Sequence, residues 1–271
     1  MDVSDPGDAR RGGILDPYGN LRWVKTFQGR TSEITSVIVD ASGAVFAAGD
    51  DRGNDVTLEG PLTTPSAFIT KLSSDGQQLF TTRVSSVSFV DTPYIMALAS
   101  SPSGEVAFSG SFGGSISFGP MSFSAPSDGG AFVAKISSTG EPRWLDPIET
   151  PFGRAAVLAL AVGPSGHIYA TGQYRGDELR IAGLTLGPTS GVAMFLLELD
   201  AGGNATDGRI FDHAGQLSAG RALAVDPAGA LVLAGHFLGQ IDLDDQTLRS
   251  ATLGSSFVAR LALPFASHRR E

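Results

Sequence analysis

The sequence contains no cysteine, and this absence excludes disulfide bonds, thiolate metal sites and cysteine nucleophiles. Basic residues are scarce: 19 lysines and arginines stand against 28 acidic residues, which gives a net charge of -9. Such a chain has no general positive field for nucleic acid or an anionic membrane surface. Long apolar runs are also missing, because no stretch approaches the length of a transmembrane helix. We therefore expect neither a nucleic-acid partner nor membrane insertion.

The two ends of the sequence are polar. Residues 1–13 lack the apolar core of a secretory signal peptide, so no signal peptide is expected in this sequence. Residues 1–13 and the charged residues 266–271 are predicted to be flexible. The residues between them, 14–265, are predicted to form a single domain.

Glycine is abundant, with 35 residues, and it marks an internal repeat of about sixty residues. One glycine series recurs at spacings of 61 to 63 residues: Gly43, Gly104, Gly166 and Gly229. A second series follows six residues after the first: Gly49, Gly110, Gly172 and Gly235. Series that keep the same pitch indicate one supersecondary unit copied four times.

Each repeat is predicted to contain four short antiparallel strands. The first strand ends in a tight turn, and the second follows at once. A long polar segment then leads to a third strand, which carries a repeated core aromatic: Phe68, Phe132, Phe195 and Phe257. Another tight turn precedes the fourth strand, as in residues 78–84 and 143–148. Alternating tight and long connections are typical of an antiparallel meander, so the expected class is all-β.

The ends of the sequence also predict how the repeats assemble. Residues 15–23 align without a gap to residues 136–144, which lead into a fourth strand. We therefore predict that the strand at residues 21–27 completes the last repeat and closes a four-bladed β-propeller. The predicted blades are residues 28–84, 85–148, 149–211, and 212–265 with 14–27. Whether the chain is a monomer or a homo-oligomer is left open.

One known repeat resembles this pattern. Val37–Gly49, taken with Ala67–Gly76, resembles the SBBP-type β-propeller repeat of bacterial proteins. Gly110–Gly119, taken with Ala131–Gly140 and Trp144, matches that pattern better. The resemblance implies a propeller that is often secreted or surface-attached, with no shared catalytic residues. It therefore implies an extracytoplasmic or cell-surface location.

The resemblance covers roughly residues 14–265. The sequence departs from the pattern at Glu198, where the other three repeats carry a basic residue: Lys71, Lys135 and Arg260. This departure raises the question of what replaces the positive charge in the third repeat.

The predicted working face is the side that collects the long segments, because functional residues concentrate in loops on a rigid scaffold. The residues just after the second glycine of each repeat should stand around this face: Asp50, Asp51, Ser111, Phe112, Gln173, Tyr174, His236 and Phe237. A polar residue followed by an aromatic can bind a sugar or a peptide. The alternative is that the aromatics pack between blades.

Two other side-chain groups are candidates for function. Asp50, Asp51, Asn54 and Asp55 place oxygen ligands close together, but their spacing misses the calcium-loop pattern, so no cofactor is expected and calcium is the alternative. Arg30, Arg154 and Arg221 precede or begin first strands and form either a local basic ring or salt links to acidic neighbours.

Motifs for catalysis are absent, because the histidines lie in different repeats or in the tail, without a nucleophile elbow or a paired-histidine motif. We therefore interpret the chain as a non-catalytic binding or scaffold module with a protein partner. A carbohydrate-binding or adhesive module is the second interpretation. A hydrolase or lyase on the long-loop face is the third, and it would need His236 or the aspartates of residues 50–55 to face a pocket.

Overall fold

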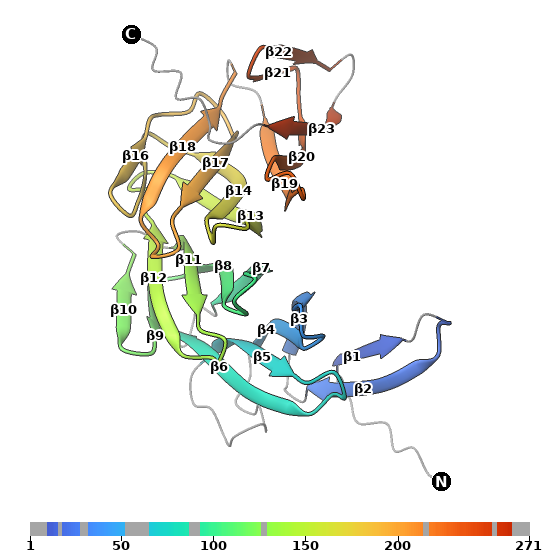
Figure 1. Ribbon diagram of the computed structural model, residues 1–271. Helices are drawn as coiled ribbons and strands as arrows, with labels where there is room; N and C mark the ends of the chain where they lie inside the picture. The colour runs from blue at the N-terminus through green and yellow to red at the C-terminus, as the bar shows by residue number, and fades with distance from the viewer. Residues whose placement is uncertain are drawn as a thin grey trace.

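The computed structural model describes residues 10–15, 18–27, 32–51, 65–86, 93–125, 129–213, 217–250 and 254–261. Every helix or strand found within these ranges is a β-strand, which confirms the predicted all-β class. The strands pair antiparallel in consecutive sheets, and Figure 1 shows the sheets arranged in an open arc. We call the four main units of this arc blades 1 to 4.

The blades follow the predicted order of strands. Blade 1 contains β3 (Ser32–Val39), β4 (Val45–Asp51), β5 (Ser66–Leu72) and β6 (Gln78–Ser86). Blade 2 contains β7 (Tyr94–Ser100), β8 (Val106–Phe112), β11 (Gly130–Ile136) and β12 (Pro142–Ile148). Blade 3 contains β13 (Arg154–Val162), β14 (Ile168–Arg175), β17 (Ala193–Leu199) and β18 (Ala205–Phe211). Blade 4 contains β19 (Ser218–Val225), β20 (Leu231–Phe237) and β23 (Ser255–Leu261).

Small hairpins occupy the long second-to-third connections of blades 2, 3 and 4, which the sequence predicted only as polar segments. They are β9 (Ser115–Phe118) with β10 (Met121–Ser124), β15 (Leu179–Ile181) with β16 (Leu184–Leu186), and β21 (Gln240–Leu243) with β22 (Gln246–Arg249). The β9–β10 hairpin also pairs with β6, so it extends the sheet of blade 1. The connections are therefore partly structured.

The predicted closure by residues 21–27 is not what this structure shows. β2 (Leu21–Phe27) pairs with β1 (Arg10–Leu15), and no described strand pairs with the outer edge of β23. Figure 1 places the β1–β2 hairpin at one end of the arc and β23 at the other. The closure prediction is therefore corrected: within the described residues the arc is open.

A glycine in the second strand sets the shape of each blade. The first strand bulges by one residue beside this glycine in all four blades. A Cβ at Gly172 would overlap the carbonyl oxygen of Ala156 on the neighbouring strand, and the equivalent glycines meet a carbonyl oxygen in the same way. Only a glycine lets the two backbones approach this closely.

A second repeated contact joins one blade to the next. A fourth-strand aromatic ring covers the turn glycine between the third and fourth strands of the following unit. Trp144 covers Gly203, Phe80 covers Gly140, and Trp23 of β2 covers Gly76; an added Cβ would lie 2.5–2.9 Å from the ring. The β1–β2 hairpin therefore docks on blade 1 as a fourth strand docks on the blade after it.

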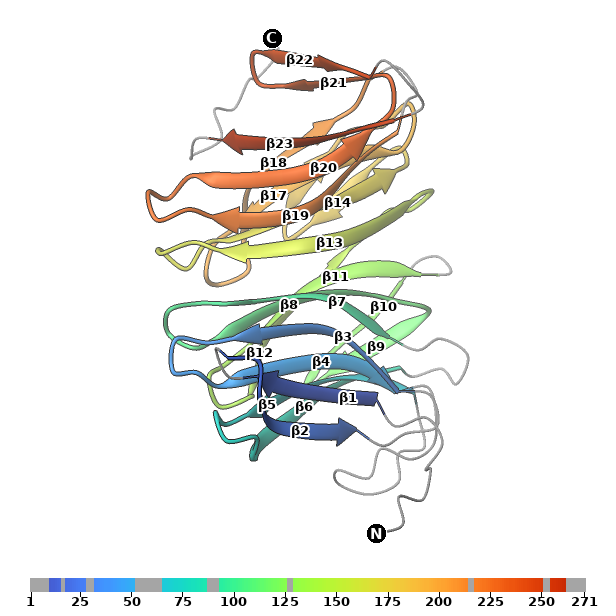
Figure 2. The same cartoon turned by 90° about the vertical axis from the view of Figure 1, so that its right-hand side faces the viewer.

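The interior is apolar and lies between the blades. The first strands contact one another in order, β3 with β7, β7 with β13 and β13 with β19, and Figure 2 shows them stacked along the inner side of the arc. Each repeated third-strand phenylalanine is buried in a cluster at a junction between units. The predicted core role of these four residues is confirmed.

The structure explains the departure at Glu198. In the other blades a basic third-strand residue pairs with an acid at the turn between the first and second strands: Lys71 with Asp40 at 3.2 Å, Lys135 with Glu105 at 2.6 Å and Arg260 with Asp226 at 2.7 Å. In blade 3 the acid lies on the third strand instead, and the Glu198 carboxylate lies 2.7 Å from His167 Nδ1. The acid has moved from the turn to the third strand, and a contact between the same two positions as in blade 2 is kept.

Exchange of the blade 3 pair tests this interpretation. Glu198→Lys alone places a cation beside His167 and should lower the free energy of unfolding by about 1–3 kcal/mol, because the hydrogen bond of the buried Glu198 carboxylate is lost. The double variant His167→Glu with Glu198→Lys reproduces the Glu105–Lys135 arrangement and should recover at least half of that loss. Urea unfolding of the parent chain, the two single variants and the double variant measures the coupling energy between positions 167 and 198. If the double variant loses as much free energy of unfolding as the two single variants lose together, the interpretation is contradicted.

The glycine contact gives a second prediction. Gly172→Ala should lower the free energy of unfolding by about 3 kcal/mol, because the new methyl group forces apart two paired strands. Gly187→Ala is the matched control, since a Cβ there meets no atom within 4 Å. Thermal and urea unfolding should leave the control within about 0.5 kcal/mol of the parent chain. Equal stability of the two variants would contradict the close approach.

Candidate functional site

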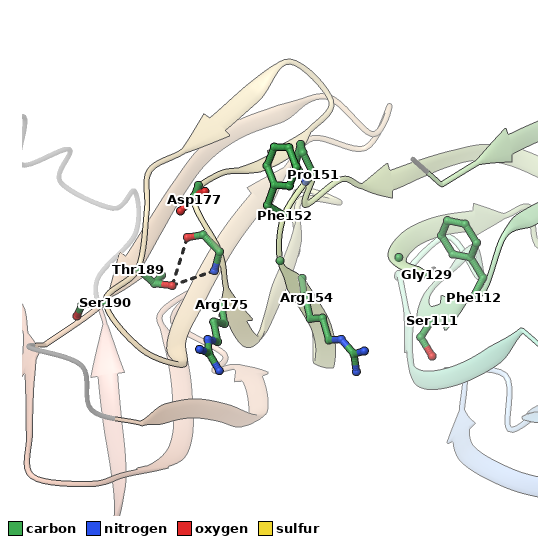
Figure 3. A pocket seen from close by; sticks show the side chains of 14 residues that line it. Ser111, Phe112, Gly129, Pro151, Phe152, Arg154, Arg175, Asp177, Thr189 and Ser190 are labelled. Atoms are coloured by element: carbon green, nitrogen blue, oxygen red, sulfur yellow. Dashed lines mark hydrogen bonds between the residues drawn. The ribbon is translucent and has the colours of Figure 1, made fainter. Parts of the chain in front are cut away.

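A cleft of about 870 Å³ opens between blades 2 and 3. One wall is formed by the end of β8, with Ser111 and Phe112, and the other by the start of β13 and the end of β14. The connection that precedes β13 carries Phe152 at the rim. The long connections converge here, so the cleft lies on the face that the sequence predicted as the working face. Figure 3 shows the side chains of both walls.

Two arginines lie side by side in this cleft. Arg154 on β13 is the direct cross-strand partner of Arg175 on β14, and both are exposed. Figure 3 shows both side chains extending in the same direction from their strands. Within the described part of the chain neither guanidinium has an ion pair or a hydrogen bond. Like charges directly opposite each other destabilise a sheet, so this pair is an arrangement for which an anion is the natural partner.

Backbone forms the floor of the cleft beside the arginines. A Cβ at Gly153 would lie 2.8 Å from the Cα of Gly176, and a Cβ at Gly176 would lie 3.0 Å from the Cα of Gly153. Side chains at these two positions would separate β13 from β14. The glycine pair therefore keeps the two arginines on one rigid support and leaves space above them.

Tyr174 lies beneath this floor. Its hydroxyl oxygen lies 3.4 Å from the Cβ position of Gly176, and it is buried without a hydrogen-bond partner among the described residues. Burial, with a smaller contribution from the Asp177 and Glu178 carboxylates, raises the pKa of Tyr174 to about 12. The phenol is therefore neutral at every physiological pH and supplies no charge to the site.

Hydrogen bonds fix the wall next to Arg175. The Gly176 amide donates to Thr189 Oγ1 at 3.1 Å, and the Thr189 amide donates to the Gly176 carbonyl at 3.0 Å. The backbone amide and hydroxyl of Ser190 both donate to the Asp212 carboxylate, at 2.8 and 2.9 Å. The connection that precedes β17 is thus tied both to β14 and to the chain after β18, so the wall is preorganised.

The rim supplies an aromatic ring and a carboxylate. Phe152 is 86% exposed, so its ring is available at the edge of the cleft. Asp177 is exposed and is the acidic side chain among the lining residues. The cleft can therefore hold an anion on two guanidiniums, cover an apolar group with a ring and accept a proton on a carboxylate.

The polar members of the predicted site do not come together in one place. Ser111 lines the cleft, and Gln173 is half-buried on β14. Asp50 is buried on β4, whereas the Asp51 side chain and the positions of Asn54 and Asp55 lie outside the described residues. No group of three potential metal ligands occurs among the described residues, and the calcium alternative stays a prediction.

The aromatic members of the predicted face are core residues. Phe112, Tyr174 and Phe237 are all buried, and the Phe112 and Phe237 rings pack against those of Phe132 and Phe257. The prediction that these three rings are exposed to stack on a sugar or a peptide is therefore wrong, because each of the three side chains is at most 4% exposed. Packing between strands and blades, the alternative interpretation, is what the structure shows.

His236 does not form an acid–base pair in this structure. Arg221 Nε lies 3.4 Å from His236 Nδ1, and burial together with the Arg221 charge lowers the pKa of this histidine. Of the arginines singled out in the sequence, Arg221 is placed on β19 beside this histidine, and Arg30 lies outside the described residues. Arg154 is the one placed in the cleft.

Sequence reasoning missed Arg175 and Phe152, and it considered Asp177 only as the neighbour of Glu178 in a pair of acids that is expected by chance. Arg175 follows Tyr174 directly, so extending the second strand of the third repeat by one residue would have placed it opposite Arg154. For Phe152 the signal was a large aromatic in a short connection between blades. Asp177 had no comparable signal in a chain with 28 acidic residues.

Comparisons with known proteins are consistent with a propeller-like fold. No family model and no curated protein matches the chain, so the SBBP resemblance is without support from a family match. Similar solved structures are a gluconolactonase from Xanthomonas campestris (15% identity, 81% of this chain and 60% of that chain, TM-score 0.37) and a glucose dehydrogenase (12% identity, 82% and 86%, TM-score 0.37). A third is virginiamycin B lyase from Staphylococcus aureus (14% identity, 82% and 74%, TM-score 0.33).

The chain covers 55% and 60% of the lengths of two of its structural neighbours, a Bacteroides caccae protein of unknown function and the gluconolactonase. The three neighbours named above are enzymes, which does not agree with the expectation of a non-catalytic scaffold with a protein partner, and that expectation is not kept. At these levels of similarity the neighbours say nothing about the substrate, which has to be argued from the cleft.

The described residues contain no helix that is long and apolar enough to cross a membrane.

The buried phenol gives a prediction for this site. Tyr174→Phe removes a hydroxyl without a partner, so the free energy of unfolding should stay unchanged or rise by about 1 kcal/mol. Tyr169→Phe is the matched control, because the Tyr169 hydroxyl donates to Glu198 at 3.4 Å and its loss should be destabilising. Urea unfolding measures both. A loss above 1 kcal/mol for Tyr174→Phe would mean that the hydroxyl has a partner after all.

Proposed function

We propose that the chain is an enzyme of the lyase or hydrolase type that binds a small organic anion in the cleft between blades 2 and 3. The observation that carries the proposal is the Arg154–Arg175 pair, two guanidiniums at directly opposed positions in the lining of a cleft. Neither makes an ion pair within the described chain. Arginine matches carboxylate and phosphate groups geometrically and stays charged at every relevant pH.

Four side chains of the cleft have separate roles in the proposed reaction. The Arg154 and Arg175 guanidiniums bind the anionic group and stabilise negative charge that develops on its oxygens. The Asp177 carboxylate, on the same rim, accepts a proton from the carbon next to a bound carboxylate; the electron pair left on that carbon forms a double bond to the neighbouring carbon, whose leaving group departs with its bonding electrons into the open cleft. In the alternative reaction, Asp177 accepts a proton from a water that attacks an ester carbonyl of the substrate. Phe152 covers the apolar part of the substrate.

Elimination is the reaction that this side-chain set supports best. Loss of a proton beside a carboxylate places charge on the carboxylate oxygens, where two fixed cations lower its energy most. The lining residues include no histidine to activate Ser111 as a nucleophile. We therefore place a lyase first and water activation by Asp177 second.

Ligand binding tests the anion site directly. Phenyl phosphate, which combines an anion with a ring, should bind the parent chain and raise its melting temperature. Arg154→Ala or Arg175→Ala should weaken binding by about tenfold to a hundredfold, because each removes a charge-assisted hydrogen bond worth about 1.5–3 kcal/mol. Arg249→Ala, an exposed arginine on β22, is the matched control and should bind like the parent chain.

Calorimetric titration of these variants separates the outcomes. Binding that is equal in the parent chain, Arg154→Ala and Arg175→Ala would contradict an anion site at this pair. The proposed role of Asp177 as the base is tested separately with Asp177→Asn. This variant should retain phenyl phosphate binding and lose turnover in a screen of substituted carboxylates and esters. Undiminished turnover in Asp177→Asn would reject Asp177 as the base while leaving the binding site intact.

A further inference from the structure

Each blade has two apolar faces that are used in a fixed order. The face toward the following blade, which we call the downstream face, carries small first-strand residues and an aliphatic third-strand residue: Ile69, Val133 and Leu196. The face toward the preceding blade, which we call the upstream face, carries the third-strand phenylalanine and a first-strand leucine, as at Leu98 and Leu160. The three junctions between blades are therefore copies of one kind of contact.

The downstream face of blade 4 is uncovered. Val258 is 77% exposed, whereas the equivalent Ile69, Val133 and Leu196 are at most 1% exposed. The small residues of the same face, Ala222 and Ala224 on β19, are also exposed. Blade 4 therefore presents to solvent the surface that blades 1, 2 and 3 bury against a following blade.

The upstream face of blade 1 is uncovered at its first strand. Val37 is 54% exposed, whereas the equivalent Leu98 and Leu160 are 6% and 7% exposed. Val39 on the same strand is 57% exposed. The chain thus carries both halves of one blade-to-blade contact, and Figure 1 shows them at opposite ends of an open arc.

The β1–β2 hairpin carries the outer part of a preceding blade. Its pairing repeats that of β11 with β12 and includes the same bulge. At one end Arg10 pairs with Phe27, as Ala131 pairs with Ile148 in blade 2. At the other end Leu15 pairs with Leu21, as Ile136 pairs with Pro142. The Trp23 indole donates to the Ser74 carbonyl at 2.9 Å, as Trp144 donates to the equivalent Ala201 at 3.3 Å. β2 is thus held on blade 1 in the position of a preceding fourth strand.

β1 is the weaker partner of β2. It corresponds to a third strand, but its sequence places Arg11 where blade 2 has Phe132, and two glycines follow. β23 has the matching Phe257, which is buried, and its outer edge has no strand beside it in the described chain. A third strand that carries the core phenylalanine pairs with a fourth strand in each of blades 1, 2 and 3.

We infer that two copies of this chain assemble head to tail into a ring. The downstream face of blade 4 in one copy packs on the upstream face of blade 1 in the other, and β23 displaces β1 to pair with β2. A twofold axis repeats this junction, so one kind of contact covers both uncovered faces of both copies and gives β23 a strand on its outer edge. The occupant is a second copy because its exposed surfaces match, position by position, those already packed at the three internal junctions.

The register of the new pairing follows from the other blades. Third and fourth strands pair Thr70 with Thr81, Ala134 with Leu145 and Leu197 with Gly208. The equivalent positions are Ala259 on β23 and Val24 on β2. Val24 of one copy is therefore expected opposite the partner subunit's Ala259, with a Cα separation within the range for a disulfide.

Disulfide crosslinking tests the junction. The chain contains no cysteine, so only the introduced cysteines can form a disulfide. Val24→Cys and Ala259→Cys are prepared as separate single variants, mixed, dissociated and reassembled in mild urea, and then oxidised. A junction between copies gives a disulfide-linked product of twice 28.0 kDa that contains one copy of each variant. Thr185→Cys replaces Ala259→Cys in the control mixture, since Thr185 is an exposed strand residue far along the chain on β16, and it should give no such product.

Solution mass provides the second measurement. Light scattering of the parent chain should give a dimer, and Val258→Asp or Val37→Asp should give a folded monomer with unchanged circular dichroism. Thr185→Asp should remain a dimer. A monomeric parent chain, or a disulfide formed within one chain when Val24→Cys and Ala259→Cys are combined in the same molecule, would overturn the inference. Growth into long filaments would overturn it as well, because the junction would then not close.

Discussion

The contact on which the arrangement of the blades depends is a fourth-strand aromatic ring seated on a turn glycine of the next unit. Trp144 and Phe80 make this contact between blades, and Trp23 makes it from the N-terminal hairpin. The ring leaves no space for a side chain on the turn, so it fixes the position of each unit against its neighbour. Because the contact is local and repeats from the hairpin to blade 1, from blade 1 to blade 2 and from blade 2 to blade 3, these units are placed one after another along an arc.

The cleft is a consequence of this placement. Blades 2 and 3 are held together at their turn side, and at the opposite side their connections are free to differ in length and composition. The glycine pair at Gly153 and Gly176 brings β13 and β14 into backbone contact there, which sets Arg154 and Arg175 side by side. The chain places two guanidiniums opposite each other at this point, whereas the like-charge cross-strand pairs Glu33 with Asp50 and Glu198 with Asp207 are acidic.

The sequence predicted the scaffold well and the site poorly, for a physical reason. Turn glycines, short apolar runs and the repeated phenylalanine are local signals, so the strands and the core position of Phe132 could be found without a structure. The cleft depends on which connections meet across two blades, and on a register that sets Arg175 opposite Arg154, and neither is local. The closure by residues 21–27 failed within the described chain because sequence alignment identified β2 as a fourth strand without showing that β1 would pair with it.

The central claim is that β2 is docked on blade 1 as β12 is docked on blade 3, and tryptophan fluorescence tests it most directly. The chain has two tryptophans, Trp23 on β2 and Trp144 on β12, and Trp144→Phe leaves Trp23 as the sole reporter. We predict that Trp23 emits at a shorter wavelength in the folded chain than in urea and shifts at the same midpoint as the circular dichroism. Emission at the wavelength of a fully solvated indole, unchanged through the unfolding transition, would contradict the account.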